Sequence, residues 1–116
     1  METLKYNGDV KALLNVREYT GWDEKNRARV VGEIAKKHTG DDAMLVDGVL
    51  GFAPSVSCTS GGIVMADGRK IEVKELTFDE YLALPVRLVG EWLELVHKVN
   101  PSWKPDFTAD IEEKKT

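Results

Sequence analysis

The sequence predicts a small α+β domain in which a β-hairpin, part of a small antiparallel sheet, packs against three to four helices. Three observations favour this class: an Asp-Gly pair between two alternating runs, threonines at two helix starts, and an apolar stripe at helical spacing near the C-terminus. A chain of 116 residues suits a single domain. We expect that domain to span residues 1–103 and to be followed by a mobile charged tail over residues 104–116.

The first helix is predicted from its cap. Alternation of apolar and polar residues first indicates a strand with one buried face over Leu14–Tyr19. Thr20 then stands where it can cap a helix that runs to about His38 and ends before Gly40. The apolar positions expected on the buried side of this helix are Trp22, Val30, Val31, Ile34 and Ala35.

The middle of the chain is predicted to hold a short second helix and a loop. Asp41-Asp42 can cap the helix, Gly51 ends it, and Pro54 keeps the chain from resuming helical form. Ser55–Gly62 is polar and small, which indicates a loop. Cys58 lies there without a histidine nearby in sequence, so we expect an ordinary thiol and no nucleophile.

The clearest local signal is a hairpin over Ile63–Val73. Asp67-Gly68 fits a two-residue turn, because both central positions of such a turn need positive φ. This register pairs Ala66 with Arg69 and Val64 with Ile71. The side chains then expected on the buried face are Val64, Ala66, Ile71 and Val73.

The last helical unit begins with a capping box, in which Thr77 is followed three residues later by Glu80. Pro85 predicts a kink or a break, and Asn100-Pro101 ends the helix that follows it. The stripe expected to face the core comprises Leu88, Val89, Trp92, Leu95, Val96 and Val99.

The composition restricts the classes of function that we expect for this chain. With 42% hydrophobic and 31% charged residues, the chain resembles an ordinary soluble globular protein. It has neither a membrane-spanning apolar run nor a secretion signal, so we expect a cytoplasmic protein. A net charge of −4 argues against nucleic-acid binding. One cysteine and two histidines offer few ligands for a metal ion, and a single cysteine excludes an internal disulfide.

No constellation of residues indicates catalysis. The paired acids Asp41-Asp42 and Asp79-Glu80 stand at predicted helix starts, where the helix dipole accounts for them. His38 follows two lysines at a helix end, and His97 lies on a helix flank. Phosphate-binding glycine motifs do not occur. We therefore expect a protein that is not an enzyme and that uses no cofactor or metal.

A second apolar line on the last helical unit points to binding instead. It comprises Leu82, Val86, Leu93 and His97, with Gly90 between its halves leaving room for another helix. Trp103 and Phe107 extend this surface toward the tail. Such a helix either bridges to a partner, which includes a second copy of the chain, or lies deep in the core with both lines buried.

One stretch of the chain resembles a known family. The run from Asp67 to Leu82, followed by Leu84-Pro85 and closed by Val99-Asn100-Pro101, is similar to tail assembly chaperones of long-tailed bacteriophages. The resemblance covers about Ile63–Trp103, and Val16–Thr20 is similar in character. It implies a non-catalytic protein of the host cytoplasm that binds the long helical tape measure protein, keeps it soluble and recruits tail tube subunits.

Two other function classes stay open. One is a small structural component of the virion, such as a tail or head–tail joining protein, which would be retained in particles. The other is a small enzyme or regulator with a site around Cys58 or a histidine.

Overall fold

The computed structural model describes residues 1–37 and 43–103, and it confirms the α+β class. Four antiparallel strands form one sheet in the order β1-β2-β3-β4. The strands are β1 (Glu2–Asn7), β2 (Lys11–Val16), β3 (Thr59–Val64) and β4 (Lys70–Glu72). The helices are α1 (Gly21–Lys37), α2 (Ala43–Cys58), α3 (Phe78–Leu82) and α4 (Val86–Val99), and short 3₁₀ turns follow at η1 (Val73–Glu75) and η2 (Pro101–Trp103).

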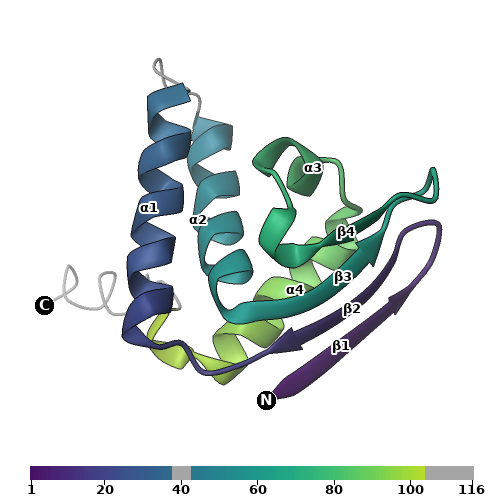
Figure 1. Ribbon diagram of the computed structural model, residues 1–116, viewed down its shortest axis with the longest axis horizontal. Helices are drawn as coiled ribbons and strands as arrows, with labels where there is room; N and C mark the ends of the chain where they lie inside the picture. Colours follow the sequence, from purple (N-terminus) through teal and green to yellow (C-terminus); the bar gives the residue numbers. More distant parts are fainter. Residues whose placement is uncertain (38–42, 104–116) are drawn as a thin grey trace, which may run out of the picture.

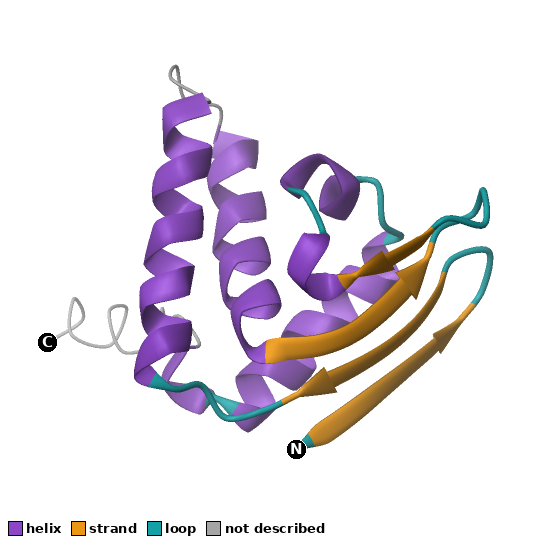
Figure 2. Ribbon diagram, viewed as in Figure 1, coloured by secondary structure: helices purple, strands orange, loops and turns teal. Residues whose placement is uncertain are grey.

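Within the described residues, the helices leave one face of the sheet open (Figure 1). Helix α4 lies across the face of β1 and β2 that is turned away from the viewer in Figure 1. Helices α1 and α2 lie side by side at one end of the sheet, and α3 lies near its β4 edge (Figures 1 and 2). Lys11, Leu13 and Lys70 on the near face are exposed. This near face is called the open sheet face below.

The core lies between the sheet and α4, as the predicted stripe requires. Leu88, Trp92 and Val96 are fully buried, and the other members of the stripe pack partly buried against them. Trp92 donates from Nε1 to Oγ1 of Thr59 at 2.9 Å, which satisfies its indole inside the core. Aromatic rings of Phe52, Phe78 and Tyr81 continue the core toward α2 and α3.

The N-terminal hairpin was not anticipated. The expected strand Leu14–Tyr19 is in fact Lys11–Val16, and it pairs with β1 so that Asn7 stands opposite Lys11. Gly8, Asp9 and Val10 lie between this last pair and form the loop of the hairpin. Tyr19 lies beyond the strand because the chain turns there toward α1.

Helix α1 begins as predicted but buries a different side. Thr20 and Asp23 cap each other: Asp23 N donates to Thr20 Oγ1 at 3.4 Å, and Thr20 N donates to Asp23 Oδ2 at 2.9 Å. Trp22, however, is 80% exposed, and Val31 is also exposed. Helix α1 packs mainly against α2, so it buries a narrow stripe centred on Ile34, and these two side chains fall on either side of that stripe.

Helix α2 corrects two predictions. It continues through Gly51 and Pro54 to Cys58, and residues 59–64 form β3, so the expected loop over Ser55–Gly62 is wrong. Its last turn is buried, and Ser57 Oγ donates to the Ala53 carbonyl at 2.7 Å, so packing in the core keeps this turn helical although Pro54 lacks an N–H. Gly51 provides close packing: a Cβ there would lie 2.8 Å from the Tyr81 hydroxyl. Asp41-Asp42 and His38 lie outside the described residues.

The second hairpin has a longer turn than expected. Met65 N donates to the Arg69 carbonyl at 2.8 Å, and Gly68 has φ +91°, so Ala66, Asp67 and Gly68 form the loop. The strands therefore pair Ile63 with Ile71 and Val64 with Lys70. A shift of the register by one residue moves every side chain of β3 to the other face of the sheet. As a result Ile63 and Met65 are buried in place of Val64 and Ala66, whereas Val73 is buried as predicted.

The C-terminal helices follow the sequence closely. The capping box of Thr77 and Glu80 is present, Pro85 separates α3 from α4, and α4 ends before Asn100-Pro101. Asn100 is buried and joins the end of α4 to the β2–α1 connection. Its Nδ2 donates to the Arg17 carbonyl and its Oδ1 accepts from Tyr19 N, both at 3.0 Å.

Candidate protein-interaction surfaces

The predicted second line lies along the outer side of α3 and α4. Val86 is 88% exposed and Leu82 is 51% exposed, so these two side chains do not belong to the core. Gly90 is also exposed, and Leu93 and His97 are half-buried. Together Leu82, Val86, Gly90, Leu93 and His97 are called the α4 outer line below.

Gly90 opens a shallow hollow in this line. The hollow measures about 440 Å³ and lies between Gly90, Leu93, Glu94, His97 and Lys98. A Cβ added at Gly90 would meet no atom within 4 Å, so the absence of a side chain there serves no packing need within the described fold. Leu93 reaches α2, where its Cδ2 lies 3.8 Å from the position of a Cβ at Gly51. The α4 outer line therefore contacts α2 at Leu93 and is exposed at Leu82 and Val86.

Trp103 does not extend this line, which corrects the expectation. Its ring stacks on Tyr19 with centroids 4.3 Å apart, and its Nε1 donates to Glu24 Oε2 at 3.0 Å. The Arg27 guanidinium lies over the same ring at 5.2 Å. Hydrogen bonds from Arg27 and then Trp103 hold the pKa of the Glu24 carboxyl below its ordinary value. Trp103 thus fastens the end of the described chain to α1, and Phe107 lies outside the described residues.

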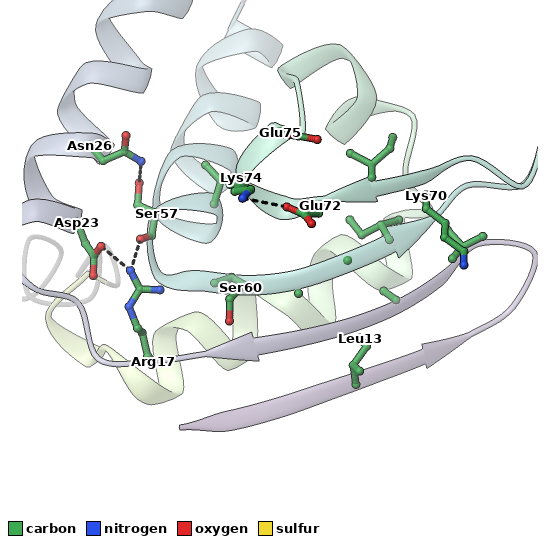
Figure 3. A pocket seen from close by; sticks show the side chains of 18 of the residues that line it. Leu13, Arg17, Asp23, Asn26, Ser57, Ser60, Lys70, Glu72, Lys74 and Glu75 are labelled. Carbon is green, nitrogen blue, oxygen red and sulfur yellow. Dashed lines mark hydrogen bonds and ion pairs between the residues drawn. The ribbon is translucent and has the colours of Figure 1, made fainter.

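A larger hollow on the open sheet face was missed from the sequence. It encloses about 1400 Å³ between the outer sides of β2, β3 and β4, the start of α1 and η1 (Figure 3). Leu13, 49% exposed, lies on its floor, and Trp22 lines it from α1. The sequence signals are Trp22 and Gly61-Gly62, whose local patterns predict a buried helix face and a loop instead.

Glycine shapes the floor of this hollow. Gly61 has φ +120°, and a Cβ there would lie 2.1 Å from the Leu13 carbonyl oxygen. Only glycine fits this backbone conformation and this approach of β3 to β2. Gly62, opposite Leu13, adds a second position without a side chain.

At the end of the hollow where α1 meets the sheet, polar side chains form hydrogen bonds and an ion pair with one another. Arg17 donates to Asp23 at 2.7 Å and to the Ser57 carbonyl at 3.4 Å, and Asn26 donates to Ser57 Oγ at 3.1 Å (Figure 3). Lys74 pairs with Glu72 at 3.1 Å. These contacts fix the rim where α1 meets the sheet, and they neutralise the charges of the groups involved.

The described chemistry offers little for catalysis. Cys58 is fully buried, its Sγ donates to the Pro54 carbonyl at 3.3 Å, and burial raises its pKa to about 11. The thiolate is therefore disfavoured at neutral pH. Within residues 1–37 and 43–103, no cluster of three or more histidine, cysteine or acidic side chains could hold a metal ion. No helix in the same described part is long and apolar enough to cross a membrane.

Comparisons of the chain with protein-family models, with curated proteins and with solved structures give no match.

Proposed function

We propose that the protein is a non-catalytic tail assembly chaperone of a long-tailed bacteriophage, which binds helical segments of the tape measure protein through the α4 outer line. The observation that carries the proposal is the two-sided character of α4. Leu88 and Trp92 are fully buried against the sheet, yet Val86 on the same helix is 88% exposed. An apolar side chain that serves no core is available to a partner.

The spacing of the line favours a helical partner. Val86, Gly90, Leu93 and His97 follow one another at intervals of four, three and four residues, which places them on one side of a helix. The gap at Gly90 admits a side chain or the backbone of a second helix at close range. A shallow surface of this kind suits the reversible binding that a holder of the tape measure protein needs before tube subunits replace it.

The resemblance described above supports the same function. The Asp67–Leu82 run folds as a hairpin feeding a capped helix, and the closing Asn100-Pro101 ends α4. A net charge of −4 keeps such a complex in solution through repulsion between like particles. Recruitment of tail tube subunits and residence in the host cytoplasm belong to the same proposal.

The test is co-expression with the tape measure protein of the phage that carries the gene. The wild-type chain should copurify with it, and Val86→Glu should abolish copurification while circular dichroism stays unchanged, because an exposed helix position tolerates glutamate. Val31→Glu, the same change at an exposed position of α1, is the matched control and should bind normally.

Three results would contradict the proposal. Absence of copurification would remove the tape measure protein as the partner. Detection of the chain in purified virions by mass spectrometry would favour the structural virion component. Light scattering that shows a stable oligomer dispersed by Val86→Glu would assign the α4 outer line to self-association.

A further inference from the structure

We infer that the open sheet face is a second docking surface, and that its occupant is an acidic amphipathic helix of another protein. This inference rests on the sheet face alone and stands apart from the proposed function. Helix α4 covers the opposite face, so the two surfaces do not overlap (Figure 1). One chain can therefore hold two segments at the same time.

The strand register places apolar and cationic side chains together on this face. Directly paired residues share a face, so Lys5, Leu13, Gly62 and Glu72 form one row across the four strands. Asn7, Lys11, Val64 and Lys70 form the next row. Leu13 and Val64 thus lie between lysines (Figure 3 shows Leu13 and Lys70), and Trp22, at the start of α1, lines the same hollow.

Trp22 is the natural anchor for a partner. It is 80% exposed, and Lys25 Nζ lies 5.3 Å from its ring centroid. A large exposed indole beside an apolar floor is typical of the residues that dominate binding energy in interfaces. Leu13, 49% exposed, adds a second apolar side chain to the same hollow.

The geometry favours a helix over an extended peptide. Backbone hydrogen bonds of a sheet lie in the plane of the sheet, so a strand laid on its face would leave its own N–H and C=O groups without partners. A helix satisfies its backbone internally and covers a sheet face by side-chain packing alone. Gly62, which stands opposite Leu13 on this face, leaves a position without a side chain and lets such a helix approach closely.

The charges select an acidic partner. Lys5, Lys11 and Lys70 are exposed on this face, and no described ion pair neutralises them, whereas Lys74 is balanced by Glu72 and Arg17 by Asp23. An excess of positive charge here contrasts with the net charge of −4 of the whole chain. The three lysines stand among the apolar side chains Leu13 and Val64, an arrangement that fits a helix with one apolar and one acidic side better than a continuous phosphate backbone, so we assign the site to an acidic protein segment.

The experiment is a titration of the ¹⁵N-labelled full chain with a defined helical peptide, followed by NMR. The peptide has a leucine stripe with glutamate on its polar side, and a matched peptide has lysine in place of glutamate. We expect saturable shifts confined to the residues of the two rows on β1, β2, β3 and β4 and to the Trp22 indole. The double variant Lys11→Glu/Lys70→Glu should weaken binding about tenfold.

Two further variants complete the test, one as a charge control and one as a test of Trp22. Lys36→Glu/Lys37→Glu makes the same charge change at two exposed positions of α1 away from the hollow and should bind like wild type. Trp22→Ala leaves the fold intact because its side chain is exposed, and it should also weaken binding. Equal binding of the lysine peptide, shifts on the α4 outer line, tighter binding of oligothymidylate, or no saturable shift would each overturn the inference.

Discussion

Trp92 Nε1 donates a hydrogen bond to Thr59 Oγ1 at 2.9 Å, and both side chains are buried. The pair joins the centre of α4 to the first residue of β3 and thereby fixes the helix across the sheet. It also fixes which side of α4 is left outside. The orientation of the α4 outer line therefore depends on a contact between residues far apart in the sequence.

Replacing Trp92 by phenylalanine should lower the free energy of unfolding by about 2–4 kcal/mol, since it leaves a cavity and an unsatisfied buried hydroxyl. Urea denaturation followed by circular dichroism measures the loss. Adding Thr59→Val in the same chain should restore about 1 kcal/mol, because both polar partners are then absent. If the two substitutions were additive, the hydrogen bond would carry no coupling energy.

Gly61→Ala and Gly90→Ala should act in opposite directions. At Gly61 a Cβ would lie 2.1 Å from the Leu13 carbonyl oxygen at φ +120°, so we expect a loss of more than about 2 kcal/mol or failure to fold. At Gly90 a Cβ meets nothing within 4 Å in a helix, so alanine should add up to about 1 kcal/mol. Thermal melts of the two variants compare them directly. A melting temperature raised by Gly61→Ala would contradict the described path of β3.

Alkaline pH should destabilise the fold through Cys58. Burial raises the pKa of this thiol from 9.0 to about 11, so the folded state keeps its proton where the unfolded state loses it. The stabilising contribution is full below pH 9 and is lost as pH rises toward 11. Denaturation midpoints between these pH values should fall less steeply in Cys58→Ala than in wild type. The remaining slope includes Tyr81, whose pKa burial raises from 10.0 to about 12.

Local chemistry was sufficient to predict the starts and ends of several elements. The caps at Thr20 and Thr77, the break at Pro85 and the end of α4 at Asn100 depend on hydrogen bonds within a few residues, so the sequence shows them directly. The apolar stripe of α4 that faces the core could also be predicted from the sequence, because an apolar face of that width must be buried.

Tertiary packing decided what local patterns left undetermined. Pro54 remains inside α2 because its turn is buried in the core, and the β3–β4 register follows from a turn one residue longer than the shortest possible one. Trp22 is exposed because α1 packs mainly against α2, along a narrow stripe. Trp103 is fastened to Tyr19 and Glu24, a contact between distant segments that no local pattern encodes. The sequence thus determined the fold class and the apolar residues of α4, whereas only packing determined which apolar side chains face outward, because exposure depends on what each element meets across the fold.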